Sequence, residues 1–191
     1  MEYKYGEEIS YDYSLIEPND YEALRTFDCG NKKLNDFIHN EVIKNGVVNN
    51  EDGLLYKVVD SKLNCIIGVV SLAASGILVT MTGFTKILPG VKIDVFAIDK
   101  MYQKLHYDKK SADSKKSSAH YYFSDEIMGV FIKRCNTISE QYAHARYITL
   151  YADKKAYRFY KRNFFKDFTE FMEKENNMEV RENIPMYMSL E

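Results

Sequence analysis

The residues best suited to chemistry in this chain lie where a strand-like run passes into a short basic helix. The run Tyr147–Tyr151 is followed by a helical segment that ends in Phe159 and Tyr160, then by Asn163 and two further aromatic residues. This order places the Tyr160 hydroxyl at the mouth of a strand-to-helix junction. A phenol has an ordinary pKa of about 10, so it can donate a hydrogen bond to a developing anion at neutral pH. Because the chain has 16 tyrosines, packing at the rim of a core is the more common alternative.

Other side chains that could carry nucleophilic or metal chemistry are poorly spaced for it. The three cysteines are Cys29, Cys65 and Cys135, and the four histidines are His39, His106, His120 and His144. No cysteine pair has CxxC spacing and the cysteine number is odd, so the sequence supports neither a disulfide framework nor a zinc site. No nucleophilic triad is indicated either. We therefore expect no metal ligands.

The length of 191 residues indicates one globular domain over residues 1–191, and a hydrophobic content of 46 % is enough for a sizeable core. A net charge of −2 argues against a broad nucleic-acid surface, although a local basic patch stays open. The first residues lack the apolar core of a signal peptide, and no apolar run reaches the roughly 18 residues of a membrane helix. We expect a cytoplasmic protein with no membrane partner.

Turn residues and periodicity predict the elements that must position Tyr160. The apolar runs predict strands at 11–17, 54–59, 65–72, 91–98, 146–151 and 184–190. Helices are predicted at 21–27, after an Asn31 cap, from Ser124 onward and at 153–162. The Pro89–Gly90 pair predicts a break before the strand at 91–98.

Two of these helices show continuous apolar faces. The first face is Leu34, Phe37, Ile38 and Val42, and the second is Ile127, Phe131, Cys135, Ile138 and Tyr142. The passage from strand 91–98 through the second helix to strand 146–151 predicts a parallel, right-handed crossover. With the remaining strands antiparallel, the fold class is α/β, a mixed sheet with helices on both faces. The polar, low-complexity segment 108–120 is predicted to be a flexible loop.

Three segments in this order resemble the GCN5-related N-acetyltransferases. Thr26–Ile38 looks like the Phe-x-Cys-Gly opening of a bacterial toxin-like branch that acetylates aminoacyl-tRNA. Val95–Gln103 resembles the family's Leu-Ala-Val-Asp-x-x-Tyr-Gln strand and turn, and Ala156–Phe165 its Ala-x-x-Phe-Tyr-x-x-x-Gly-Phe segment. The resemblance covers nearly the whole chain and implies a mostly antiparallel sheet with a central, splayed parallel strand pair.

The resemblance also implies roles for particular residues. It makes acetyl-CoA the cosubstrate, with its pantetheine amides pairing like an added strand along Phe96, Ala97 and Ile98. It implies that Tyr160 acts as an acid or a hydrogen-bond donor toward the departing thiolate. It leaves a homodimer and an RNA partner open.

The chain departs from the family in the turn after this strand. The family carries glycines there whose backbone N–H groups wrap the CoA pyrophosphate. Here the cofactor-binding positions are Gln103, Lys104, His106, Tyr107 and Asp108. Side chains at these positions block the close approach of the backbone to the pyrophosphate, and the Asp108 carboxylate would repel a phosphate group. Either the chain has lost CoA affinity, or the phosphates are held by the side chains of Lys104, Lys109, Lys110, Lys115 and Lys116.

No general base is evident, since the candidates Asp94, Asp99, Glu126 and His144 have other common roles. An α-amino group, with a pKa near 8, needs less help from a base than a lysine side chain near 10.4. The resemblance implies an amine acceptor, and of the two an α-amine such as that of aminoacyl-tRNA is the easier case. A basic run, Lys154, Lys155, Arg158, Lys161, Arg162 and Lys166, fits either the CoA 3′-phosphate or an RNA backbone.

These observations together predict an acetyl-CoA-dependent N-acetyltransferase with direct attack of the amine on the thioester. The alternative is a catalytically silent relative that binds a protein or RNA. The altered turn at 103–108 favours that alternative, whereas the retained Tyr160 speaks against it.

Overall fold

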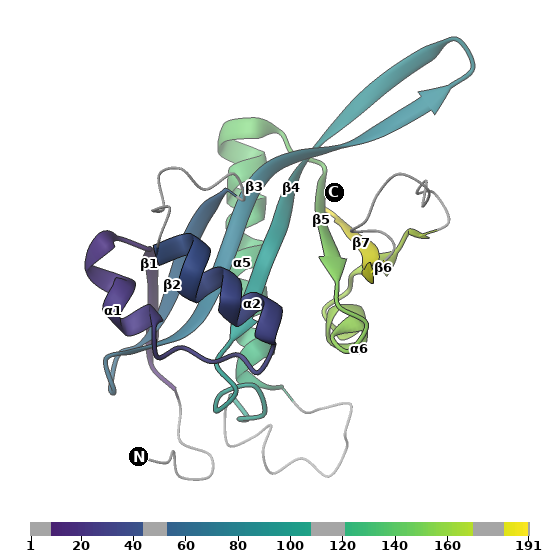
Figure 1. Ribbon diagram of the computed structural model, residues 1–191. Helices are drawn as coiled ribbons and strands as arrows, with labels where there is room; N and C mark the ends of the chain where they lie inside the picture. Colours follow the sequence, from purple (N-terminus) through teal and green to yellow (C-terminus); the bar gives the residue numbers. More distant parts are fainter. Residues whose placement is uncertain (1–8, 44–52, 108–120, 170–181, 191) are drawn as a thin grey trace. The chain divides into compact units, whose positions relative to one another are not determined.

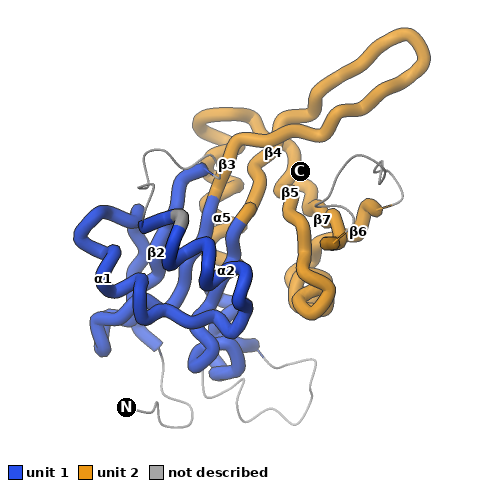
Figure 2. Tube along the Cα trace, viewed as in Figure 1, with its two compact units in different colours: residues 1–71, 95–127 blue, residues 72–94, 128–191 orange. Residues whose placement is uncertain are grey.

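The computed structural model describes residues 9–43, 53–107, 121–169 and 182–190. The chain divides into two compact units, drawn in blue and orange in Figure 2. Unit 1 comprises 1–71 and 95–127, and unit 2 comprises 72–94 and 128–191. The sequence-based expectation of one domain over 1–191 stays a prediction, and the predicted loop 108–120 lies outside the described residues.

The strands form one mixed sheet of seven strands in the order β1-β2-β3-β4-β5-β7-β6 (Figure 1). Their bounds are β1 Tyr11–Leu15, β2 Leu54–Asp60, β3 Cys65–Met81, β4 Phe84–Ile98, β5 Tyr147–Ala152, β6 Lys166–Asp167 and β7 Ile184–Ser189. Strands β4 and β5 are parallel, whereas β1–β2, β5–β7 and β6–β7 are antiparallel. The predicted mixed sheet with a parallel strand pair is therefore confirmed.

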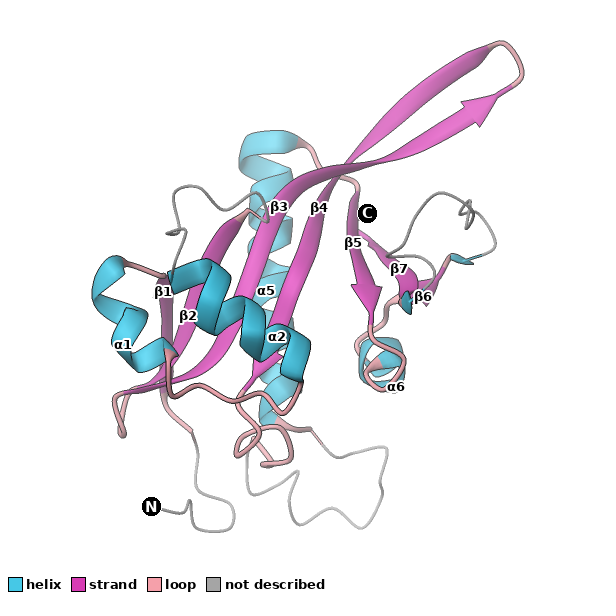
Figure 3. Ribbon diagram, in the orientation of Figure 1, coloured by secondary structure: helices cyan, strands magenta, loops and turns pink. Residues whose placement is uncertain are grey.

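The helical segments are short apart from α5 (Figure 3). Their bounds are η1 Pro18–Asp20, α1 Tyr21–Leu24, α2 Lys32–Asp36, η2 Phe37–Val42, α5 Phe123–Ile138, η5 Ser139–Ala143 and α6 Tyr157–Arg162. Among the described residues, no helix is long and apolar enough to cross a membrane, and no group of metal-ligating side chains could hold an ion.

The core of unit 1 forms where α2 and η2 lie against the strands. The Asn31 side chain caps α2 by accepting the N–H groups of Lys33 and Leu34, as predicted. Ile38 and Val42 are buried, and Leu34 packs against the same cluster. The other buried members of this cluster are Ile16, Leu24, Phe27, Cys29, Leu55, Val69, Val95 and Ala97. The apolar face predicted for this helix is confirmed.

In unit 2 the prediction of a break at Pro89–Gly90 is wrong, because β4 runs through both residues. The Pro89 carbonyl accepts the Arg146 N–H at 2.8 Å, and Gly90 pairs with Tyr147 of β5. A Cβ on Gly90 would lie only 2.9 Å from the Tyr147 carbonyl oxygen. The glycine thus allows the backbones of β4 and β5 to approach closely. Interpreting Pro89–Gly90 as a turn signal misses this reason for the glycine.

Strands β3 and β4 are also longer than predicted, and their distal parts form the hairpin seen in Figure 1. Gly83, with a φ of 91°, makes its turn. The hairpin exposes four large apolar side chains, Leu78, Met81, Phe84 and Ile87. Sequence reasoning left residues 73–88 unassigned, since apolar residues on an exposed hairpin resemble a core segment.

The apolar stripe predicted for the long helix is confirmed in its first part and wrong at its end. Ile127, Phe131 and Cys135 are fully buried, whereas Tyr142 is 80 % exposed. The helix continues into the π-helical turn η5, in which the His144 N–H reaches the Ser139 carbonyl. That wider turn rotates Tyr142 out of the 3.6-residue stripe.

Candidate active site

Tyr160 is positioned by the turn that leads from β5 into α6. The Ala156 N–H donates to the Asp153 carbonyl at 2.8 Å, which closes this turn. The Tyr160 N–H then donates to the Ala156 carbonyl at 3.2 Å and begins the helical ladder. These bonds turn the Tyr160 side chain inward, where it is 8 % exposed.

The end of α6 is a Schellman motif. The Phe165 N–H donates to the Tyr160 carbonyl at 3.1 Å, and the Phe164 N–H donates to the Lys161 carbonyl at 3.2 Å. The residue that this motif places in the left-handed region is Phe164, with a φ of 69°. Glycine usually occupies that position, and in the motif that this segment resembles it is glycine.

The Tyr160 ring is enclosed by aromatic neighbours. Its centroid lies 5.1 Å from that of Phe159 and 5.9 Å from that of Phe165, both edge-on. Burial, and secondarily the Asp153 carboxylate, raise the pKa of Tyr160 above its ordinary value. The Tyr160 hydroxyl forms no hydrogen bond with any described residue. A nearly buried hydroxyl that lacks a partner within the described part of the chain is rare and points to a ligand or water.

The predicted cofactor strand is the end of β4 in unit 1. Ala97 and Ile98 are buried, and Phe96 is half-buried. Ala97 belongs to the unit 1 core, and the Ile98 carbonyl accepts the Gln103 side-chain amide at 2.8 Å. Ala97 and Ile98 are thus held by the core and by Gln103, and the contact of the three residues with a cofactor stays a prediction.

Gln103 ties together two segments of unit 1. Its side-chain amide donates to the carbonyls of Cys29 and Ile98, both at 2.8 Å. Its backbone N–H donates to the Asp99 carbonyl at 3.2 Å. The Asp99 carboxylate accepts the Met101 N–H at 2.9 Å, so this turn is held from within. The amide of Gln103 is therefore engaged by the protein.

His106 and Tyr107 pair with the two residues that precede α5, Tyr121 and Tyr122. His106 makes an antiparallel bridge with Tyr122, and their rings lie 4.9 Å apart and tilted by 30°. The Tyr107 N–H donates to the Tyr121 carbonyl at 3.0 Å. In a glycine-rich phosphate turn such N–H groups face the ligand, whereas the Tyr107 N–H is bonded within the chain.

Lys104 and Asp108 complete the set predicted from the sequence. Lys104 is exposed on the turn of unit 1. Asp108 lies outside the described residues, as do the lysines between 109 and 116 that the sequence offers as phosphate ligands.

The two carboxylates in the first turn of α5 accept hydrogen bonds from a backbone N–H group and from tyrosine hydroxyls. The Asp125 carboxylate accepts the Tyr122 N–H at 3.0 Å. The Glu126 carboxylate accepts the hydroxyls of Tyr11 at 2.8 Å and Tyr121 at 3.0 Å. Burial, followed by these hydrogen bonds, raises the pKa of both tyrosines above the ordinary value. Each carboxylate oxygen of Glu126 therefore already accepts one tyrosine hydroxyl.

The other bases considered from the sequence are placed as follows. Asp94 forms an ion pair with Lys92, and the Asp99 carboxylate is engaged within its turn. His144 is exposed, with a φ of 44°. None of these three side chains therefore has the arrangement of an activated base, and the nature of the acceptor stays a prediction.

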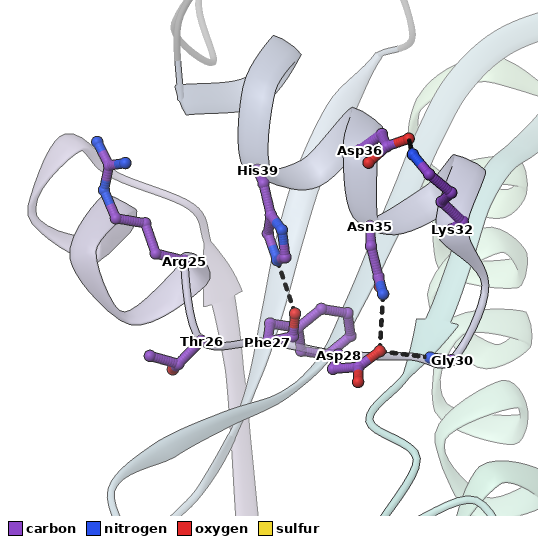
Figure 4. Close-up of a pocket in the computed structure, with 9 residues that line it drawn as sticks. All are labelled: Arg25, Thr26, Phe27, Asp28, Gly30, Lys32, Asn35, Asp36 and His39. Atoms are coloured by element: carbon purple, nitrogen blue, oxygen red, sulfur yellow. Dashed lines mark hydrogen bonds and ion pairs between the residues drawn. The ribbon is translucent and has the colours of Figure 1, made fainter.

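Unit 1 holds a shallow cavity of about 540 Å³ that sequence reasoning did not identify (Figure 4). Its lining residues are Arg25, Thr26, Phe27, Asp28, Gly30, Lys32, Asn35, Asp36 and His39. The Asp28 carboxylate accepts the Gly30 N–H at 2.8 Å and the Asn35 amide at 2.7 Å, and the His39 ring lies 2.7 Å from the Phe27 carbonyl. The Phe27–Gly30 run thus forms hydrogen bonds with the helical residues beside it, and most of the polar groups that line the cavity already have a partner in the protein.

Comparisons with known proteins show which solved structures share this fold. No protein-family model matches the chain, and no curated protein is significantly similar to it in sequence. A bacterial toxin structure matches with a TM-score of 0.69 at 17 % identity, over 95 % of this chain and 92 % of that one. The AtaTR complex bound with acetyl-CoA matches with a TM-score of 0.67 at 16 % identity, over 94 % of each chain. AtaT complexed with acetyl-methionyl-tRNA matches with a TM-score of 0.64 at 17 % identity, over 94 % of this chain and 95 % of that one.

At these identities the likeness shows the fold. The mixed sheet implied by the resemblance to GCN5-related N-acetyltransferases is the fold that this chain shares with these toxins, so the resemblance is confirmed at that level. The residue roles that it implies are not tested by the likeness.

Proposed function

We propose that this chain is an N-acetyltransferase that moves the acetyl group of acetyl-CoA to a primary amine. The observation that carries the proposal is the nearly buried Tyr160 hydroxyl, which has no partner among the described residues. The shared fold supports it, because toxins of this fold were solved with acetyl-CoA and with acetylated methionyl-tRNA. In the proposal the acceptor is an α-amine such as that of aminoacyl-tRNA.

The chemistry that this implies is a direct transfer. The amine nitrogen forms a bond to the acetyl carbon while the carbon–sulfur bond breaks, and a proton passes from the amine to solvent. The Tyr160 hydroxyl donates a hydrogen bond to the departing sulfur. Since its raised pKa lies well above the value of about 8.5 for a thiol, complete proton transfer from Tyr160 is uphill. Hydrogen-bond stabilisation, with the proton supplied by water, is the role we assign.

Contacts to acetyl-CoA follow the predicted strand and turn. Phe96, Ala97 and Ile98 are proposed to line the pantetheine chain. For the phosphates, the exposed ammonium of Lys104 is a better candidate than the turn backbone, because the Tyr107 N–H already has a protein acceptor. Gln103 has a positioning role, since its amide holds two carbonyls of unit 1.

One observation favours a catalytically silent relative as the second candidate. The turn that carries phosphate in the resembling family is closed here by the His106–Tyr122 bridge and followed by the acidic start of α5. Carboxylates at a helix N-terminus oppose binding of a second anion there. Such a protein would keep the fold and a partner surface without turnover.

Calorimetric titration of the whole chain with acetyl-CoA tests the proposal. Binding in the micromolar to submillimolar range is expected, as is usual for a substrate. Release of free thiol should then be faster with methionyl-tRNA than with a lysine-containing peptide blocked at its α-amine. No detectable binding at millimolar acetyl-CoA would overturn the enzyme and leave the silent relative.

A further inference from the structure

Phe164 combines two unfavourable properties. Its φ of 69° lies in the left-handed region, where a bulky side chain is strained. Its side chain is also 80 % exposed. Glycine would relieve the strain and remove the exposed ring, so the folded state alone gives no reason for phenylalanine at this position.

Phe164 adds no packing that its neighbours lack. Phe165 is buried to 1 % exposure and makes the ring contact that usually accompanies a Schellman motif. The buried Asn163 amide donates to the Phe159 carbonyl at 3.0 Å. Phe164 has no ring contact with any described residue. The end of α6 is therefore held by the residues on either side of Phe164.

The stretch of chain on either side of Phe164 is rich in exposed cations. Six exposed basic residues lie within the same stretch of chain: Lys154, Lys155, Arg158, Lys161, Arg162 and Lys166. All but Arg162, whose guanidinium lies 5.5 Å from the Phe159 ring, are free of ion pairs with described residues. The two carboxylates of this stretch accept local N–H groups, Asp153 from Lys155 and Asp167 from Thr169.

We propose that Phe164 and these cations form a binding surface for single-stranded nucleic acid, with a base stacked on the Phe164 ring and phosphates on the lysines and arginines. An exposed aromatic ring between cations is the pattern that binds single strands, because every base has a face that stacks. An apolar protein partner would call for apolar neighbours, whereas the exposed residues beside Phe164 are charged. The cations also outnumber those that one CoA nucleotide can contact at once.

Fluorescence anisotropy with a labelled uridine 12-mer RNA measures the stacking contribution. Phe164→Ala is expected to weaken binding by about 5- to 100-fold, and Phe164→Trp to retain it. Tyr142→Ala is the matched control, since Tyr142 is also 80 % exposed in unit 2, and its affinity should equal that of the original protein. No binding of the 12-mer at low salt, or equal losses for Phe164→Ala and Tyr142→Ala, would overturn the proposal.

Thermal unfolding separates this role from a structural one. Phe164→Gly is expected to raise Tm, because glycine relieves the left-handed strain, while RNA affinity falls as in Phe164→Ala. A lower Tm for Phe164→Gly would show that the ring stabilises the fold and would contradict the proposal.

The salt dependence tests the cations independently. Arg158→Gln and Lys161→Gln should each reduce the slope of log affinity against log salt by about 0.7, while Phe164→Ala leaves the slope unchanged. Lys133→Gln, an exposed lysine of α5, is the control and should have no effect. Unchanged slopes for the α6 variants would sink the assignment of phosphates to this surface.

A titration with acetyl-CoA distinguishes the two nucleotide sources. Phe164→Ala should leave acetyl-CoA affinity unchanged; loss of acetyl-CoA affinity with unchanged RNA affinity would assign the ring to the cofactor and overturn the proposal. The RNA measurements need no turnover, so they stand or fall separately from the acetyltransferase.

Discussion

Tyr102 in unit 1 and Tyr160 in unit 2 are buried almost equally, with 6 % and 8 % exposure, yet their hydroxyls differ in their hydrogen bonding. The Tyr102 hydroxyl donates to the Asp60 carboxylate at 2.8 Å and lies 3.9 Å from the Cys65 sulfur. The Tyr160 hydroxyl has no hydrogen-bond partner among the described residues. Burial raises the pKa of both, with Asp60 adding to the effect at Tyr102 and Asp153 at Tyr160.

The difference separates a structural tyrosine from a candidate functional one. Asp60 also accepts the N–H groups of Lys62 and Leu63, so Tyr102 completes a satisfied buried network. Around Tyr160 the backbone groups are also hydrogen-bonded. The Tyr160 hydroxyl, however, has no hydrogen bond and the Phe164 ring no ring contact with the described residues. Groups that the fold orders but does not use are the ones available to a ligand.

The strongest test of the satisfied network is Asp60→Ala. It leaves two N–H groups and the Tyr102 hydroxyl without their buried acceptor, so the free energy of unfolding should fall by about 3–5 kcal/mol. Urea denaturation measures this loss. Asp12→Ala removes an exposed carboxylate of β1 and should cost no more than about 0.5 kcal/mol. Similar losses in the two variants would remove Asp60 from its structural role.

Exchanging each tyrosine for phenylalanine tests the comparison directly. Tyr160→Phe should lower turnover about 100-fold, equivalent to roughly 2.7 kcal/mol, and leave acetyl-CoA affinity and Tm nearly unchanged. Tyr102→Phe should instead lower stability by about 1.5–3 kcal/mol, because Asp60 loses a donor. Tyr157→Phe, on the same helix as Tyr160, is the control. Unchanged turnover in Tyr160→Phe would take this hydroxyl out of the mechanism.

Gly90→Ala tests whether the strand that leads to Tyr160 depends on close backbone contact. The added Cβ would meet the Tyr147 carbonyl, which cannot move without disturbing the β4–β5 ladder, so a loss of about 2 kcal/mol is expected. At Gly68 of unit 1, an added Cβ would meet side-chain carbons of Ile98 and Val58 at 3.1–3.3 Å. Since side chains can shift, Gly68→Ala should be milder by urea denaturation; the reverse order would contradict this account.

The smallest effect concerns the acid stability of unit 1. The Lys100 ammonium first, then the Gly30 N–H and the Asn35 amide, hold the pKa of Asp28 well below its usual range. The folded state therefore binds fewer protons than the unfolded one. The stabilisation is complete above the unfolded pKa of about 3.9 and is lost as the pH falls below it. In Lys100→Met, Tm should fall less steeply than in the original protein between about pH 4 and pH 2. Lys133→Met should keep the original slope, and equal slopes in all three proteins would refute the role of Lys100.

Local patterns predicted much of the fold. The Asn31 cap, the apolar face of α2 and η2, and the buried start of the α5 stripe depend on residues within a few turns of one another. The candidate site was partly accessible in the same way, because the Phe159–Tyr160 segment and the strand ending at Ile98 are visible as motifs. The lack of a described partner for the Tyr160 hydroxyl was not predictable, since all 16 tyrosines look alike in a sequence.

By itself, then, the sequence determined the order of most strands and helices, the apolar face of α2 and η2, and which tyrosine stands at a strand-to-helix junction, because these follow from short-range spacing. Only the tertiary structure decided that β4 continues through Pro89–Gly90, since the reason is the approach of a distant strand. It alone showed that the Tyr102 hydroxyl donates to Asp60, whereas the Tyr160 hydroxyl has no partner within the described ranges, and that Phe164 is held in a left-handed conformation. Those outcomes depend on partners and backbone geometry that local spacing does not specify.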